Sequence, residues 1–164
     1  MTGFKFKTTE EHFNLFDFHD CHIKRIEEEN GNIVLEFAYV YISEQHPLNP
    51  YPVAKSTGPC KATFTDVSTH QAILYIEAQP AAIYIEGKET EFEEVPVSLI
   101  DLAQMEIVKS AKKANEKGFI FDFFGIDWKT SEFCGLAIKA EGFILEWGEF
   151  EEDAWYVNWD SGEK

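Results

Sequence analysis

Short runs of β-branched and aromatic residues recur along the chain, and turn-forming residues separate most of them. The first two runs, at about 22–29 and 33–42, flank Asn30-Gly31, and Asn-Gly in this setting is a strong signal for a β-hairpin. Residues 1–15 are predicted to form a frayed lead-in. We therefore expect the antiparallel strands to begin near residue 22.

A proline-rich segment follows the predicted hairpin. Residues 43–59 contain four prolines, which fix φ and remove ladder donors, so this segment is predicted to be a long loop. After it, polar and apolar residues alternate with the period of a strand that has one face in water. Strands are expected at four places, namely 60–67, 73–76, 82–85 and, as an acidic edge strand, 89–95.

The segment from Ser98 to Gly118 fits two descriptions. Its apolar residues have helical spacing, with Gly118 as a stop and lysines near that end, where a helix dipole favours positive charge. Alternatively, 105–108 is a strand and 110–118 is a hairpin loop. Helix and strand therefore both stay open for residues 98–117.

The last third of the chain again has the pattern of strands. Apolar runs at 119–124, 136–140, 143–147 and 155–159 are mostly preceded by glycine. Strands recurring at such short spacing favour antiparallel sheets in a sandwich or open barrel. We predict a mainly β fold with one or two short helices, in a single domain over residues 1–164.

The charge of the chain narrows the choice of partners. The sequence has 30 Asp and Glu against 14 Lys and Arg, a net charge of −16, and its 15% aromatic content distinguishes it from a disordered acidic tail. An acidic folded surface repels nucleic-acid phosphates and anionic lipids and attracts cationic surfaces. We expect no nucleic acid and no membrane as partner, and a basic protein is the partner that the charge favours.

The three cysteines are widely spaced and form no C-x-x-C motif, so neither a disulfide framework nor a zinc site is indicated. Buried, reduced thiols are expected. The first 30 residues lack the apolar region of a signal peptide, and no apolar run is long enough to cross a membrane. The predicted location is cytoplasmic, and no cofactor is predicted.

Acidic and aromatic residues gather near the C-terminus. Residues 141–164 hold eight acids and one lysine, a net charge of −7. Aromatic anchors surrounded by carboxylates suit an interface for a cationic partner. The alternative is that the tryptophans lie in the core and the acids on the wet face. The interaction candidates are Glu146, Trp147, Glu149, Glu151, Glu152, Asp153 and Trp155.

A metal site and a nucleophilic cysteine have weaker support in the sequence than an interaction surface. His19, Asp20 and His22 are possible ligands of a divalent metal, but on a strand His19 points away from the other two. Asp20 could instead bond to neighbouring backbone N–H groups. A Cys/His nucleophile from Cys60 or Cys134 with His46 or His70 would require a proximity that the sequence does not show. No catalytic residue is predicted.

Two parts of the chain, about 18–37 and 119–147, resemble small bacterial β-rich families of unknown function. The first part contains Phe18-His19-Asp20-Cys21-His22-Ile23 and Ile33-Val34-Leu35-Glu36-Phe37, and the second contains Phe121-Asp122-Phe123-Phe124-Gly125 and Ile144-Leu145-Glu146-Trp147. Some of these proteins are similar to immunity proteins, which block a bacterial toxin by binding it. The resemblance implies an intracellular interaction protein and brings no catalytic residue with it.

Three functions follow from these observations. The first is a protein-interaction module, such as an immunity-type inhibitor of a basic partner. The second is a small β-barrel whose mouth, lined by Phe and Tyr, holds an apolar molecule. The third is a metal-dependent enzyme that uses His19, Asp20 and His22.

Overall fold

The computed structural model describes residues 3–77 and 92–157. Eleven strands and two short 3-10 helices follow one another in these ranges: β1 (Phe6–Thr9), η1 (Glu10–Leu15), β2 (Phe16–Asp17), β3 (Ile23–Glu29), β4 (Asn32–Phe37), β5 (Tyr41–Ile42), β6 (Lys55–Ser56), β7 (Cys60–Glu77), β8 (Phe92–Val97), η2 (Leu99–Leu102), β9 (Met105–Asn115), β10 (Gly118–Asp127) and β11 (Phe133–Trp147). The predicted mainly β fold with short helices is confirmed.

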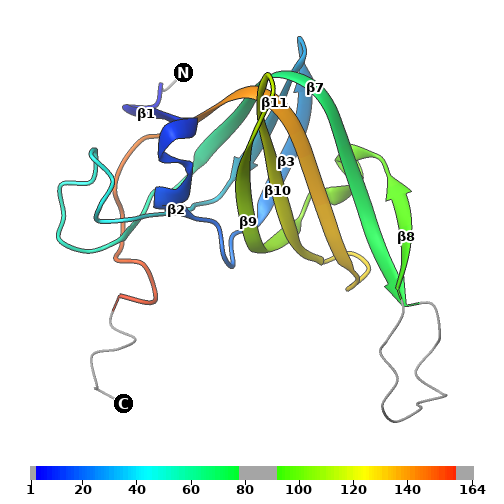
Figure 1. The fold of residues 1–164 in the computed structure, drawn as a ribbon. Helices are drawn as coiled ribbons and strands as arrows, with labels where there is room; N and C mark the ends of the chain where they lie inside the picture. Colours follow the sequence, from blue (N-terminus) through cyan, green and yellow to red (C-terminus); the bar gives the residue numbers. More distant parts are fainter. Residues whose placement is uncertain (1–2, 78–91, 158–164) are drawn as a thin grey trace.

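The main sheet is antiparallel and has the strand order β3-β4-β7-β11-β10-β9. Strand β1 pairs with the end of β11, and β8 pairs with the end of β7. The sheet curls so that the segment just before β3 meets β9, where Asp20 N–H donates to Ile107 O and Ile107 N–H donates to Cys21 O. The result is a barrel-like sheet, with η1 and β2 at one end and β8 at another side (Figure 1).

Strand β7 is the element on which the rest of the sheet depends. It is 18 residues long and pairs with β11 along one edge. Its other edge is shared by two strands, β4 opposite Cys60–Phe64 and β8 opposite Ala72–Glu77. Among the described residues, no strand pairs with this edge between Phe64 and Ala72.

Phenylalanine rings fill the inside of the curled sheet. The Phe64 and Phe121 ring centroids lie 5.1 Å apart, and Phe13, from η1, lies 5.1 Å from Phe143. All four rings are buried. Full burial of such a side chain stabilises the fold by roughly 1.5–3 kcal/mol. An apolar ligand inside the sheet would have to displace these rings.

The hairpin predicted at Asn30-Gly31 is confirmed. Both residues have positive φ, 52° and 83°, as the type I′ turn between two strands requires. The second predicted strand, 33–42, is shorter than expected: β4 ends at Phe37, and Tyr41–Ile42 forms β5 in a separate sheet of the order β2-β5-β6.

Further sequence predictions differ from the structure. The described part of the predicted lead-in contains β1 and η1, and Phe13 of η1 is buried in the core. The segment 98–118 is not one helix: only η2 is helical, and strand β9 continues to Asn115 instead of ending at a loop. The runs 136–140 and 143–147 are one strand, β11, in which Gly142 pairs with Thr65.

Other predictions fall partly outside the described residues. The run 82–85 lies wholly outside them, and the acidic strand at 89–95 is described only from Phe92, where β8 begins. Of the predicted strand 155–159, residues 155–157 form a turn. In the part of the chain that the structure describes, no helix has the length and apolarity needed to span a membrane.

Candidate functional site

Trp147, one of the two predicted aromatic anchors near the C-terminus, is a core residue. Its side chain is 0% exposed and stacks on Phe6, with ring centroids 5.4 Å apart. Trp147 is therefore not available to a partner, which corrects its place among the interaction candidates. Trp155 is 48% exposed and remains accessible.

The carboxylates near Trp147 are partly neutralised by lysines from distant parts of the chain. Asp153 Oδ1 lies 2.7 Å from Lys55 Nζ, and Glu149 Oε1 lies 4.0 Å from Lys5 Nζ. The backbone of residues 151–152 is also engaged, because Glu151 N–H donates to Ser56 O and Glu152 O accepts from Ser56 N–H. The acidic segment at residues 151–153 therefore runs beside β6.

Glu146 is the remaining acid of this cluster within a strand. It lies in register with Lys7 of β1 on one side and Lys61 of β7 on the other. Neighbouring opposite charges on adjacent strands stabilise a sheet. Of the predicted acids, Glu146, Glu151 and Glu152 have no ion pair among the described residues.

The three metal candidates do not converge. His19 Nδ1 pairs with Asp20 Oδ2 at 3.2 Å, whereas His22 Nε2 pairs with Glu106 Oε1 at 3.5 Å. The carboxylate that accepts a nearby backbone N–H is that of Asp17, which bonds to His19 N. In the described ranges, no three His, Cys, Asp or Glu side chains are grouped as a metal ion would require.

The cysteines and histidines considered as nucleophile and base have other surroundings. Cys60 and Cys134 are free and buried, and loss of solvation raises the pKa of each thiol to about 12. His46 bonds to the Thr8 hydroxyl and to the Leu48 N–H. The prediction that the cysteines are buried is confirmed.

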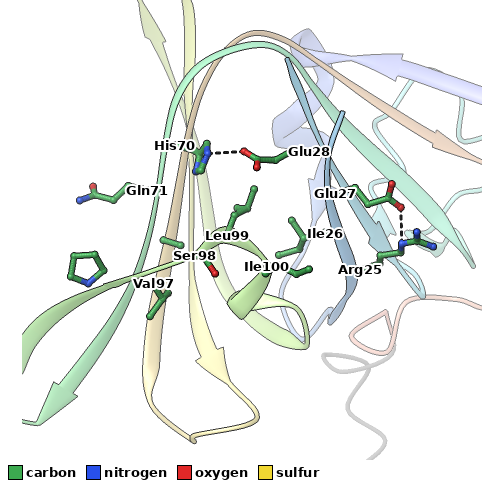
Figure 2. Close-up of a pocket in the computed structure, with 12 residues that line it drawn as sticks. Arg25, Ile26, Glu27, Glu28, His70, Gln71, Val97, Ser98, Leu99 and Ile100 are labelled. Carbon is green, nitrogen blue, oxygen red and sulfur yellow. Dashed lines mark ion pairs between the residues drawn. The ribbon is translucent and has the colours of Figure 1, made fainter. Parts of the chain in front are cut away.

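A groove opens beside the unpaired stretch of β7, and Figure 2 shows the side chains around it. Its volume is about 730 Å³. The walls come from β3, from the middle of β7 and from the junction of β8 with η2. Twelve residues line it: Arg25, Ile26, Glu27, Glu28, His70, Gln71, Ala72, Pro96, Val97, Ser98, Leu99 and Ile100. We refer to these residues together as the β7 groove.

Local turn chemistry at both ends of the groove explains why it exists. At one end the β3–β4 turn makes the last contacts with β7, since Val67 N–H donates to Gly31 O and Asp66 N–H donates to Asn32 Oδ1. At the other end Ser98 stops β8. The Ser98 hydroxyl and its N–H both donate to Asp101 Oδ2, at 2.8 and 3.1 Å, and turn the chain into η2.

The groove combines an apolar floor with charged walls. Ile26, Ala72 and Leu99 are buried beneath it, while Ile100 at its rim is 65% exposed. His70 of β7 and Glu28 of β3 point toward each other across the groove, with His70 Nε2 2.9 Å from Glu28 Oε1 (Figure 2).

The outer wall of the groove carries a second ion pair. Arg25 Nε lies 2.6 Å from Glu27 Oε1, and both side chains lie on the side of β3 away from His70 (Figure 2). With His counted as neutral, one cation and two carboxylates leave the lining with a net charge of −1. Glu29 adds a further carboxylate in the adjoining hollow, which shares Glu28 and His70 with the groove.

The sequence analysis did not identify this groove. The acidic run 27–29 and the absence of Gly and Pro from 60 to 76 were visible, and the latter indicates one long strand. Which strands pair with its far edge, and where they leave it, depends on contacts between residues far apart in the chain.

Comparisons with known proteins do not assign the chain to a group. It matches no family model, and no similar curated protein or solved structure was found.

Proposed function

We propose that this protein is a protein-interaction module and that the β7 groove binds a basic segment of its partner. The observation that supports this most directly is the coincidence, in one groove, of a buried apolar floor, the Glu28 carboxylate and an edge of β7 that no described strand covers. Each of the three recognises a different part of an extended basic segment.

Electrostatics at two ranges support a basic partner. The net charge of −16 attracts a cationic protein from a distance and speeds association. Near the surface, Glu28 supplies a carboxylate whose described ion-pair partner is the weak base His70. A lysine or arginine of the partner would compete well for such a carboxylate because its charge is permanent at neutral pH.

The specific form that we propose is an intracellular immunity-type inhibitor, which occludes a basic toxin by binding it. This rests on the acidic composition and on the resemblance carried by residues 18–37 and 119–147. A toxin gene next to this one would identify the partner. Co-expression should then protect cells from that toxin, and a Glu28→Gln variant should protect them less well.

The two other functions have less support from the described residues. A ligand-binding barrel requires interior space, and rings such as Phe64, Phe121 and Phe143 occupy the inside of the sheet. A metal-dependent enzyme requires His19, Asp20 and His22 to converge, and they are held in two separate pairs.

A labelled peptide of alternating lysine and valine provides a direct test. Fluorescence anisotropy should show binding at about 10 mM salt that weakens at about 0.15 M, because the Debye length falls from about 30 to about 8 Å. A peptide of alternating glutamate and valine should not bind. Binding that is absent, or that is the same for both peptides, would contradict the proposal.

A matched pair of charge variants locates the binding. Glu28→Gln should lower the affinity for the lysine–valine peptide by up to about fivefold, which is the upper range for one exposed ion pair. Glu152→Gln removes the same charge from the exposed C-terminal segment and should change affinity less than about twofold. Equal losses would show that net charge alone, and not the groove, governs binding.

A further inference from the structure

We propose that the partner segment enters the β7 groove as an added β-strand, antiparallel to β7 and in line with β8 and β4. This inference rests on the proposed function, and it names the kind of segment and its mode of binding. The groove is then a gap in the sheet that the partner completes.

The backbone of β7 supports this mode. Residues 69–71 pair with β11 on one edge, Ser68 lies at a bulge between Thr69 and Val67, and no described strand covers the other edge of residues 68–71. In an antiparallel ladder the N–H and C=O groups point alternately to the two edges, so about half of those in 68–71 face the groove. An extended segment can pair with them, as in other cases of strand addition.

The flanking strands define the direction and length of the added strand. β8 ends with Val97 opposite Ala72, and β4 starts with Ile33 opposite Phe64, so both run in the same direction along β7. A segment that continues the line of β8 would lie opposite Gln71 first and Ser68 last. Four residues at about 3.4 Å each span about 14 Å of strand.

Side-chain positions indicate which residues the segment should contain. In antiparallel pairs, directly opposed residues project from the same face of the sheet. A residue opposite His70 therefore projects toward Glu28, where a lysine or arginine would form an ion pair. Its neighbours on the same face approach the apolar floor near Ala72 and Leu99. The expected segment alternates and carries at least one basic residue.

Other sheet margins suit such a segment less well. Strand β9 carries Lys109 and Lys113, which repel a basic strand and are a common protection of sheet edges. Strand β8 contains Pro96, which cannot donate a ladder hydrogen bond. Residues 68–71 of β7 themselves contain neither a lysine nor a proline.

N-methylated peptides distinguish strand addition from charge attraction alone. Two isomers of the lysine–valine peptide would carry N-methyl groups either on every lysine amide or on every valine amide. Because these two sets of amides face opposite edges of a strand, one isomer should bind at least about tenfold more weakly, and the other should bind within about twofold of the parent. Equal affinity of the two isomers would overturn the inference.

Hydrogen exchange provides an independent readout on the protein itself. Binding of the unmodified lysine–valine peptide should slow exchange of groove-facing amides within 68–71 by about tenfold or more, because new ladder bonds protect them. Peptide binding without this protection would overturn strand addition and leave the interaction module standing. Failure of the unmodified peptide to bind would instead contradict the proposed function.

Discussion

The acidic C-terminal segment and the β7 groove differ in how much of their chemistry remains free for a partner. Residues 141–164 carry a net charge of −7, whereas the lining of the groove carries −1. Yet Asp153 and Glu149 pair with lysines, and Trp147 lies in the core. The groove keeps an unpaired strand edge and an exposed apolar rim. Charge density along a chain therefore does not show where a carboxylate lies beside an apolar floor and a strand edge.

Sheet geometry accounts for this difference. Neighbouring strands lie about 4.8 Å apart, so an acid in one strand is within reach of a lysine in the next. Glu146 has such a lysine on each side. Glu28, at the margin of β3, faces the groove, and its ion-pair partner among the described residues is the weak base His70.

The largest expected effect concerns the two tryptophans of the C-terminal region. Trp147→Ala should lower the free energy of unfolding by about 3–5 kcal/mol, because it leaves a cavity in the core. Trp155→Ala, at a position that is 48% exposed and in ring contact with His19 and Tyr156, should lower it by only about 1 kcal/mol. Urea denaturation of both variants would measure this contrast. Similar small losses would show that Trp147 is not a core residue.

The next largest effect is a pH dependence of stability that arises from His46, whose ring lies beside Trp147. Burial, and then the neighbouring His12, lower the pKa of His46 to about 4 from its ordinary value of 6.5. The Leu48 N–H donates to His46 Nδ1, so a second proton there would remove that bond. The folded state therefore binds this proton less readily than the unfolded state.

Because the folded pKa is the lower one, stability is fully present above pH 6.5 and is lost as the pH falls toward about 4. The loss should approach about 3 kcal/mol, from a pKa difference of about 2.5 units. Urea titrations between pH 7 and 4 would measure it. The His46→Gln variant should flatten this part of the profile, and an unchanged slope would contradict the assignment to His46.

A smaller effect is expected in the groove. His70→Ala removes the competitor for Glu28, so the lysine–valine peptide should bind about two- to threefold more tightly, within the range of an exposed ion pair. His22→Ala is a matched control, because it breaks a similar pair with Glu106 outside the groove. A gain in affinity for both variants would show that the effect is not local.

The smallest expected effect tests whether the acidic C-terminal segment, and not the β7 groove, binds the peptide. Asp153→Asn breaks the pair with Lys55 and should cost about 0.2–1 kcal/mol of stability, with no change in peptide binding. Urea denaturation and anisotropy on the same preparation would test both statements. A loss of peptide affinity would place the binding surface at the C-terminal segment instead.

The sequence predicted those features that depend on neighbouring residues. Asn30-Gly31 adopts the two positive φ values of a hairpin turn, and strand-like alternation identified most of β7, β10 and β11. Phe13 was missed because η1 is only six residues long, which is too short to show a helical period. The metal candidates His19, Asp20 and His22 lie close together in the chain. In the structure, however, His19 pairs with Asp20, whereas His22 pairs with Glu106.

The sequence by itself determined a mainly β chain, its hairpin turn and its acidic character, because backbone preference and charge are local properties. Only the tertiary structure decided which acids meet lysines, that Trp147 is buried, and where β4 and β8 leave the edge of β7. These outcomes depend on pairings between residues far apart in the chain, such as Glu28 with His70. The groove is a product of such pairings, so no single stretch of sequence predicts it.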